Sequence, residues 1–303
     1  MTTHIYDHSP LNVGSIQVPT PEISSVTPAQ IQTAENVRPH IHAEVGRYRL
    51  RMAQNVEDRN AACRLRFKVF NIELGEGLES SYQTGLDSDQ FDQYCEHLLV
   101  EDKVSRCIVG TYRMQSGESA ARNLGYYSEQ EFHLAPYEPL RRGILELGRA
   151  SIDREHRTPE VLTLLWRGIA QYATDMGLRY LIGCSSLNSQ DPAEGWQMYQ
   201  QLEQYRVATE FETVPTVRFA CPTEHIGRDS QQPAAEESAD LPTQAPIPVK
   251  IPKLLKTYLA IGARIAAPPA WDREFGTIDF LTLLDLKTLS PAARNRFLAP
   301  LTQ

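Results

Sequence analysis

The sequence predicts a mixed α/β fold in which helices flank a central sheet. Segments with the alternating or continuous apolar pattern of strands take turns along the chain with segments whose apolar residues recur at helical spacing. The chain has 303 residues, of which 41% are hydrophobic, enough for a sizeable core. No stretch approaches the ~18 consecutive apolar residues that span a bilayer.

The first part of the predicted sheet precedes residue 153. Residues 46–54 alternate as a strand, and Asn55 begins a helix whose apolar positions continue to Ile72. After a polar loop, residues 97–102 and 107–114 form a strand pair joined by a tight turn. Residues 143–152 (GILELGRASI) then read as a central strand that contains Gly148.

The second part begins with a helix that Thr158 caps, with Pro159 in its first turn and Gly177 at its end. Residues 179–186 (RYLIGCSS) form another buried strand. A shorter helix at about 193–204 follows, and a strand at 208–213 completes the predicted sheet.

Composition divides the chain into four parts. Residues 1–43 mix Thr, Ser, Pro, His and Gln without any sustained period, so we expect a disordered leader. Within 226–248, the stretch from Arg228 has only Leu241 as a large aliphatic residue before Ile247, so we expect a disordered linker. Residues 44–225 form the predicted core, and residues 249–303 are expected to pack on it.

Charge and targeting signals exclude several classes. A formal net charge of −8 argues against a nucleic-acid-binding protein, which needs a basic face. The first ten residues lack the basic and apolar regions of a secretory signal, so we expect a cytoplasmic protein. The five cysteines are scattered, which favours reduced thiols.

The central strand and the turn after it hold the candidate chemistry. A helix N-terminus with nearby arginines, here Arg154 and Arg157, is suited to binding a phosphate. The alternative is an ordinary turn with solvated arginines. In a regular strand Glu146 and Arg149 point to opposite faces, whereas a bulge at Gly148 brings them onto one face.

The run from about Arg64 to Tyr205 resembles the GCN5-related N-acyltransferases, in the branch of ornithine acyltransferases, N-acyl amino acid synthases and acyl-homoserine lactone synthases. The stretch Pro252 to Asp285 also resembles the ornithine acyltransferase type. The motifs that carry the resemblance occur in order at Arg64–Phe70, Asp89–Asp92, Val109–Arg113, Glu146–Arg149 and Leu164–Ala170.

The resemblance implies a splayed sheet that holds the phosphopantetheine arm of acyl carrier protein or CoA, with no permanently bound cofactor. Its phosphate is expected at Arg154, Arg157 and Thr158, although Thr158-Pro159 stands where relatives usually have glycines. The implied reaction moves a fatty acyl group, in some relatives 3-hydroxylated, to the amine of an amino acid, foremost ornithine. The product then resembles a lyso-ornithine lipid.

The candidate catalytic residues are Glu146, Arg149 and Tyr199. An attacking amine must lose a proton, and Glu146 is the candidate base, acting directly or through a water. Backbone N–H groups at the bulge are expected to stabilise the oxyanion. Tyr199 lies where this fold often keeps a tyrosine that protonates the leaving thiolate.

The candidate acceptor pocket consists of Arg66, Phe70, Asp89, Asp92 and Arg113. The carboxylates are expected to bind the substrate ammonium and an arginine its carboxylate. The alternative is a purely structural ion-pair network around a loop. The acidic run at 87–92 lacks the glycine and distal glutamate of a calcium loop, so we expect no metal site.

Two other functions stay open. None of the three tryptophans lies between the first helix motif and the aspartates, where acyl-homoserine lactone synthases typically carry one, which favours the lipid branch over signal synthesis. A non-catalytic acyl-binding regulatory module is the other alternative. Lysines interleaved with apolar residues at 250–259 indicate either a helix packed on the core or peripheral membrane contact.

Overall fold

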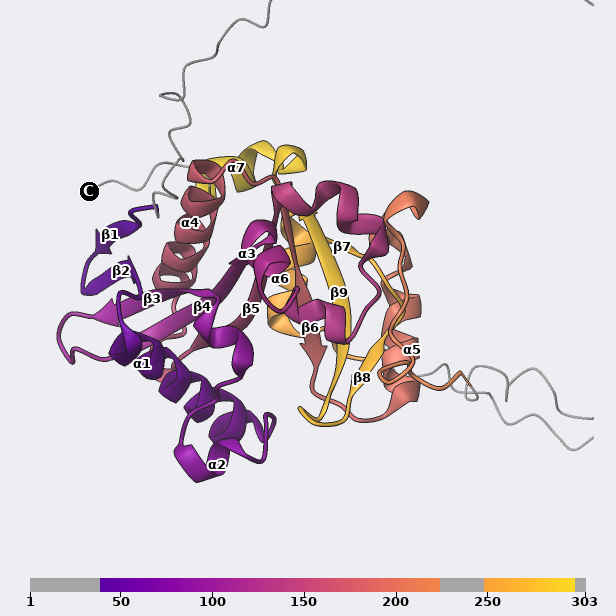
Figure 1. Ribbon diagram of the computed structural model, residues 1–303, viewed down its shortest axis with the longest axis horizontal. Coiled ribbons are helices and arrows are strands. Elements are labelled where there is room, and N and C mark those ends of the chain that lie inside the picture. The colour runs from indigo at the N-terminus through magenta and orange to yellow at the C-terminus, as the bar shows by residue number, and fades with distance from the viewer. Residues whose placement is uncertain (1–38, 224–247, 298–303) are drawn as a thin grey trace, which may run out of the picture. The chain divides into compact units, whose positions relative to one another are not determined.

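The computed structural model describes residues 39–223 and 248–297 and consists of one twisted sheet with helices on both faces (Figure 1). The nine strands run in the order β1-β2-β3-β4-β5-β6-β9-β7, and β8 pairs with β9. The strands are β1 (His42–Val45), β2 (Tyr48–Met52), β3 (Glu96–Asp102), β4 (Ile108–Ser116), β5 (Ile144–Ile152), β6 (Tyr180–Leu187), β7 (Arg264–Ile265), β8 (Ala270–Asp272) and β9 (Thr277–Asp285).

The predicted mixed α/β fold is confirmed. The α-helices of the described residues are α1 (Val56–Phe67), α2 (Ser81–Thr84), α3 (Gly117–Arg122), α4 (Pro159–Asp175), α5 (Pro192–Gln201), α6 (Lys253–Ile261) and α7 (Pro291–Phe297). A π-helical turn at Lys68–Leu74 extends α1.

Helices α1 and α4 cover opposite faces of the sheet. Neighbouring residues of a strand point to opposite faces, so adjacent residues of β3 contact different helices. On β3, Leu98 lies against Gly168 of α4. The next residue, Leu99, clusters with Ala62 of α1. As predicted, the Thr158 side chain accepts a hydrogen bond from the backbone of α4, and Gly177 ends the helix with a φ of 66°.

Strands β5 and β6 are parallel and separate after a short paired stretch, which confirms the splayed sheet. They pair only from Ile144 to Glu146 on β5, although both strands continue well beyond. At the point of separation Gly183 packs against the chain of β5, where a Cβ atom would lie 2.2 Å from the carbonyl oxygen of Leu147. Beyond it, the two strands diverge (Figure 1). The residues of both diverging parts line a cavity.

The strand predicted at 208–213 is wrong. Residues 209–211 form a 3-10 helix, and Ala208, Thr209 and Glu210 are exposed. The neighbour of β6 is instead β9, which pairs with it antiparallel from Tyr180 to Leu187 and is buried over nearly its whole length. Periodicity in one segment does not reveal a partner that lies about ninety residues further along the chain.

The sheet also departs from the predicted boundaries at both ends. The described chain enters the fold within the segment 1–43, because Ile41 and Ala43 are buried and β1 begins at His42. Most of that segment and most of 226–248 lie outside the described residues. The part that follows the predicted linker does not merely cover the core, since it supplies three strands, β7 to β9, to the sheet.

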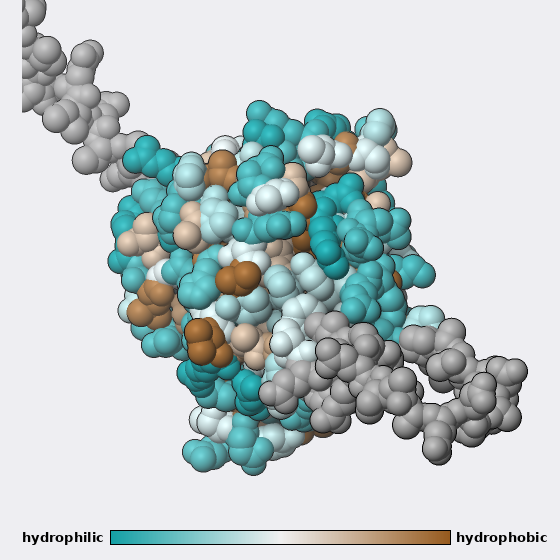
Figure 2. Space-filling model, turned by 90° about the vertical axis from the view of Figure 1, so that its right-hand side faces the viewer, coloured by the Kyte–Doolittle hydropathy of each residue, from teal (hydrophilic) through white to brown (hydrophobic). Residues whose placement is uncertain are grey.

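Helix α6 packs on the body rather than displaying its apolar side. Leu255 and Leu259 are buried, whereas Lys253 and Lys256 are exposed. In the described parts of the chain, no helix combines the length and the apolar character that crossing a bilayer requires. On the face shown in Figure 2, apolar side chains are scattered among polar ones.

Candidate active site

A deep cavity opens where β5 and β6 separate. Its volume is about 1210 Å³, and the diverging halves of both strands line it, from Leu147 to Ile152 and from Gly183 to Leu187. A cavity of this size accepts a ligand larger than an ordinary metabolite. The divergence of two parallel strands therefore creates the binding space.

Strand β5 is distorted beside this cavity, as predicted, but the distortion is centred on Arg149. The register between β4 and β5 shifts between Thr111 and Arg113, where β5 carries an extra residue. Arg149 adopts a φ of 52°, whereas Gly148 lies outside the left-handed region. A Cβ atom on Gly148 would meet no atom within 4 Å because it borders the cavity.

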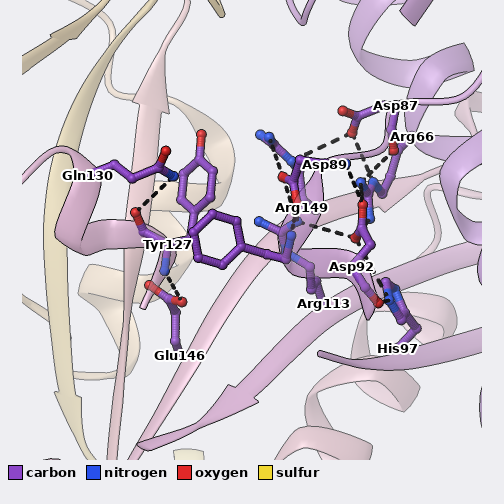
Figure 3. Close-up of polar contacts among 11 residues, drawn as sticks. Arg66, Asp87, Asp89, Asp92, His97, Arg113, Tyr127, Gln130, Glu146 and Arg149 are labelled. Carbon is purple, nitrogen blue, oxygen red and sulfur yellow. Dashed lines mark hydrogen bonds and ion pairs between the residues drawn. The ribbon is translucent and has the colours of Figure 1, made fainter. Parts of the chain in front are cut away.

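Glu146 and Arg149 share one side of the sheet and contact the same segment (Figure 3). The Tyr127 amide donates to Oε2 of Glu146 at 2.8 Å, and the amide and hydroxyl of Ser128 donate to Oε1 at 2.8 and 2.7 Å. The Arg149 guanidinium lies 5.0 Å from the centre of the Tyr127 ring. The bulge thus brings the two charged side chains to one wall.

The Glu146 carboxyl is buried, 5% exposed, and lines the cavity. Burial raises its pKa above the usual range, and the hydrogen bonds from Ser128 and Tyr127 and the charge of Arg113 oppose this shift. A raised pKa brings a carboxylate closer to the basicity that proton transfer from an amine requires. The geometry is therefore suited to a general base.

The predicted ion-pair network is present, and Arg149 and Asp87 belong to it as well (Figure 3). Fully buried Arg66 donates to Asp87 at 2.9 Å and to both oxygens of Asp92 at 2.7 and 2.9 Å. Arg113 donates to both oxygens of Asp89 at 2.7 Å. Three guanidinium groups thus face three carboxylates.

This network neutralises the carboxylates that were expected to bind the acceptor. Burial and the neighbouring guanidinium groups lower the pKa of His97, which lies against Asp92, to about 4, so this histidine adds no charge near neutral pH. Arg66, Asp89 and Asp92 do not line the cavity, whereas Arg113 and Arg149 do. For Arg66, Asp89 and Asp92, which do not line the cavity, the arrangement matches the alternative of a purely structural ion-pair network.

Phe70 and Tyr199, the two predicted aromatic site residues, lie in different surroundings. Phe70 lines the cavity and packs edge-on against the Phe275 ring, with 5.4 Å between the ring centres. Tyr199 does not line it and packs between Trp196 and Arg206. The face of α5 turned to the cavity carries Glu194 and Gln197, and Tyr199 lies on another side of the helix.

The turn before α4 lies at the mouth of the cavity. Arg157 and Thr158 line it, whereas Arg154 is exposed and does not. Arg157 forms a two-pronged ion pair with Glu73 at 2.5 and 2.8 Å and donates to the carbonyl oxygen of Ile152. Of the three predicted phosphate ligands, two are thus placed at the cavity, and one of these already has an acidic partner.

The cavity lining is largely apolar and aromatic where α4 and α6 contribute to it, and we call this part the apolar branch. The Tyr258 ring contacts Trp166 edge-on at 5.5 Å, and its hydroxyl forms a hydrogen bond with the hydroxyl of Tyr112. The apolar and aromatic side chains of this branch are Tyr112, Leu147, Leu162, Trp166, Leu181, Leu255, Tyr258 and Leu284. An extended hydrocarbon chain fits such surroundings.

Several cavity residues were missed by the sequence analysis. Tyr127 and Ser128, which hold Glu146, belong to a short 3-10 helix in a loop without a motif. A second group of carboxylates, Glu131, Asp272 and Asp279, lies in the same cavity. Asp279 carried one signal, since it is the single charged residue within the largely apolar run 278–284 of β9.

Comparison with known proteins agrees with this architecture. The family described as acetyltransferase (GNAT) domain matches residues 65–167. The L-ornithine N(alpha)-acyltransferase of Brucella abortus is 30% identical over 297 residues, covering 91% of this chain and all of that protein. The enzyme of the same name from Rhodobacter capsulatus is 28% identical over 255 residues, covering 82% of this chain and 93% of that one.

The solved structures that align with this chain share little sequence with it. An N-acyl amino acid synthase from uncultured soil microbes aligns with a TM-score of 0.47 at 12% identity, covering 84% of this chain and 97% of that one. The acyl-homoserine lactone synthase LasI aligns with a TM-score of 0.45 at 9% identity, covering the same shares. From its sequence relatives, the chain is an acyltransferase of the GNAT superfamily and belongs to the family of the L-ornithine N(alpha)-acyltransferases.

Proposed function

We propose that this protein transfers a fatty acyl group from a phosphopantetheine thioester to the α-amine of ornithine. The product is a lyso-ornithine-lipid-like N-acyl amino acid. The names of the relatives support the acceptor. The observation that carries the proposal is the buried carboxyl of Glu146 on the wall of the cavity between the diverging strands.

In the proposed reaction Glu146 accepts a proton from the attacking amine, directly or through a water. An α-amine is mostly protonated near neutral pH, and only its neutral form attacks a thioester. The three hydrogen bonds from Tyr127 and Ser128 hold the Glu146 carboxylate in place. Because the bulge at Arg149 interrupts the ladder with β4, backbone N–H groups near it are candidates for stabilising the oxyanion.

The proposed donor is a long-chain acyl carrier protein or acyl-CoA, which present the same phosphopantetheine arm. The apolar branch beside Leu162, Trp166 and Leu255 supports a long chain, since an acetyl group does not need such a space. The start of α4, with Arg157 and Thr158, is the candidate site for the phosphate. Because the product is a lipid, we also propose a cytoplasmic location with peripheral contact at the inner face of the membrane.

The test is mass spectrometry of lipid extracts from cells that express wild-type protein or Glu146→Gln. We expect a new N-acyl-ornithine in wild-type extracts and its loss in the variant. Glu101→Gln is the matched control, because Glu101 is also a buried strand glutamate, 5% exposed, but does not line the cavity. Wild-type and Glu146→Gln extracts that are identical contradict the proposal, and an acyl-homoserine lactone in the medium supports signal synthesis instead.

A further inference from the structure

Three carboxylates, one from a loop and two from the paired strands β8 and β9, meet on the wall of the cavity. Glu131 follows the 3-10 helix that holds Glu146, Asp272 ends β8, and Asp279 lies in β9. Their side chains each present an oxygen within 4.8 Å of the other two, and they are 1%, 6% and 4% exposed. A fourth acidic residue, Glu76, lines the same cavity.

In contrast to the network around Arg66, this group has no cation of its own. No ion pair formed within residues 39–223 and 248–297 includes Glu131, Asp272 or Asp279. Both carboxyl oxygens of Glu131 and Oδ1 of Asp279 are buried without a hydrogen-bond donor among the described residues. Buried charges of one sign without a partner are unfavourable, which points to a ligand that supplies the positive charge.

The carboxyl groups of this part of the cavity have raised pKa values. Burial raises the pKa of Asp279 to about 6; a hydrogen bond with Ser186 opposes this shift, and the charge of Asp272 adds to it. Burial, together with the charges of Asp279 and Asp272, raises the pKa of Glu131 well above its usual range. Burial and the charge of Asp279 raise the pKa of Glu76 to about 7.

The group lies next to the candidate base. The Ser128 hydroxyl donates to Glu146 at 2.7 Å and lies 3.5 Å from Sγ of Cys184. Cys184 lines the same cavity, and burial first, and then the charge of nearby Glu131, raises the pKa of its thiol. One small molecule in the cavity can therefore reach Glu146 and the carboxylate group together.

We propose that Glu131, Asp272 and Asp279 bind the side-chain ammonium of a dibasic amino acid and so direct its α-amine to Glu146. This inference rests on the proposed function. An alkylammonium carries three N–H donors and matches three converging acceptors. The Asp89 and Asp92 carboxylates cannot serve this purpose, because Arg66 and Arg113 already occupy them.

A divalent metal ion is the competing occupant, since carboxylates are also its ligands. Mg²⁺ and Ca²⁺ prefer six or more oxygen ligands, of which the three carboxylates can supply some and water the others. The contiguity with Glu146 in one cavity favours the ammonium of the acceptor itself. The experiment below distinguishes the two occupants.

The experiment compares L-ornithine with L-norvaline, which has the same carbon chain without the terminal amine. N-acylation is measured with wild-type, Glu131→Gln, Asp279→Asn and, as control, Glu101→Gln. For wild type and the control we expect a kcat/KM for ornithine about 10- to 100-fold above that for norvaline, the effect of one charge-assisted contact. Either cluster variant should lower this ratio toward one, through the KM for ornithine, with norvaline acylation unchanged.

A wild-type protein that acylates both amino acids equally overturns this inference and leaves the proposed function intact. Variants that lose activity on both substrates equally overturn it as well, and the second variant guards against a folding defect in the first. A stoichiometric divalent ion in purified wild type that is lost in Glu131→Gln assigns the site to a metal instead. If no amine is acylated, the proposed function fails, and binding is then measured by thermal shift. A rise in wild-type Tm with ornithine but not with norvaline, lost in Glu131→Gln, supports the ammonium site. If ornithine does not raise the wild-type Tm, the ammonium site is overturned.

Discussion

Replacing Arg66 by methionine tests the physical basis of the site most severely. Arg66 is fully buried and makes hydrogen bonds to Asp87 and to both oxygens of Asp92. Its removal leaves two buried carboxylates without their main partner, which costs about 3–5 kcal/mol of unfolding free energy. For a domain of this size that corresponds to a fall in Tm of roughly 6–20 °C.

The effect should also depend on pH in a definite direction. Burial alone raises the pKa of Asp92, but the charge and hydrogen bonds of Arg66 and the charge of Arg113 hold it below its usual range. The stability from this pair is therefore fully present above the unfolded-state pKa of about 4 and is lost as the pH falls through the lower folded-state value. The difference between wild type and Arg66→Met should thus be largest near neutral pH and shrink in acid.

The assay is thermal unfolding followed by circular dichroism between neutral and acidic pH. Arg122→Met is the control, because Arg122 forms an exposed pair with Glu118 on α3, and exposed pairs contribute about 0–1 kcal/mol. A fall in Tm for Arg66→Met no larger than that of the control, or one that does not vary with pH, refutes the reasoning.

Three further predictions concern the cavity. Tyr199→Phe should leave kcat unchanged in a steady-state acylation assay, because Tyr199 lies off the cavity, and a large loss would restore it as the acid. Gly183→Ala should lower the unfolding free energy by about 1–3 kcal/mol in chemical denaturation, since its Cβ would lie 2.2 Å from the Leu147 oxygen. Gly148→Ala is the control, because a Cβ at that position meets no atom within 4 Å. Equal stabilities of the two variants would contradict the account. Leu162→Trp should shift donor preference to shorter acyl chains by filling the apolar branch, and an unchanged chain-length profile would place the acyl chain elsewhere.

Local patterns in the sequence predicted much of the fold. The alternation before Asn55, the cap at Thr158 and the stop at Gly177 each depend on neighbouring residues, and each appears in the structure as expected. The distortion of β5 was also expected, but its centre at Arg149 depends on pairing with β4, which the local sequence does not contain.

Long-range pairing explains what the sequence did not reveal. Strand β9 joins the sheet beside β6 across a long separation in sequence, and this pairing brings Asp279 opposite Ser186 in the cavity. Glu131 reaches the same place from a loop without any motif. Asp272 and Asp279 lie on the neighbouring strands β8 and β9, but their meeting with the distant Glu131 cannot be recognised from spacing. The Asp89 and Asp92 motif could be recognised, although its carboxylates face arginines.

The central claim is that the Glu146 carboxylate accepts the proton of the attacking amine. It is tested most directly by the pH dependence of kcat/KM for ornithine, measured with purified wild type and Glu146→Gln of equal Tm. Because only the deprotonated carboxylate can act and burial raises its pKa, wild-type kcat/KM should fall with decreasing pH at a pKa above the usual glutamate range. The variant should be slow, and its kcat/KM should instead follow the fraction of neutral substrate amine and rise with pH up to the pKa of that amine. A Glu146→Gln protein that keeps the wild-type rate and the same acidic limb would contradict the account.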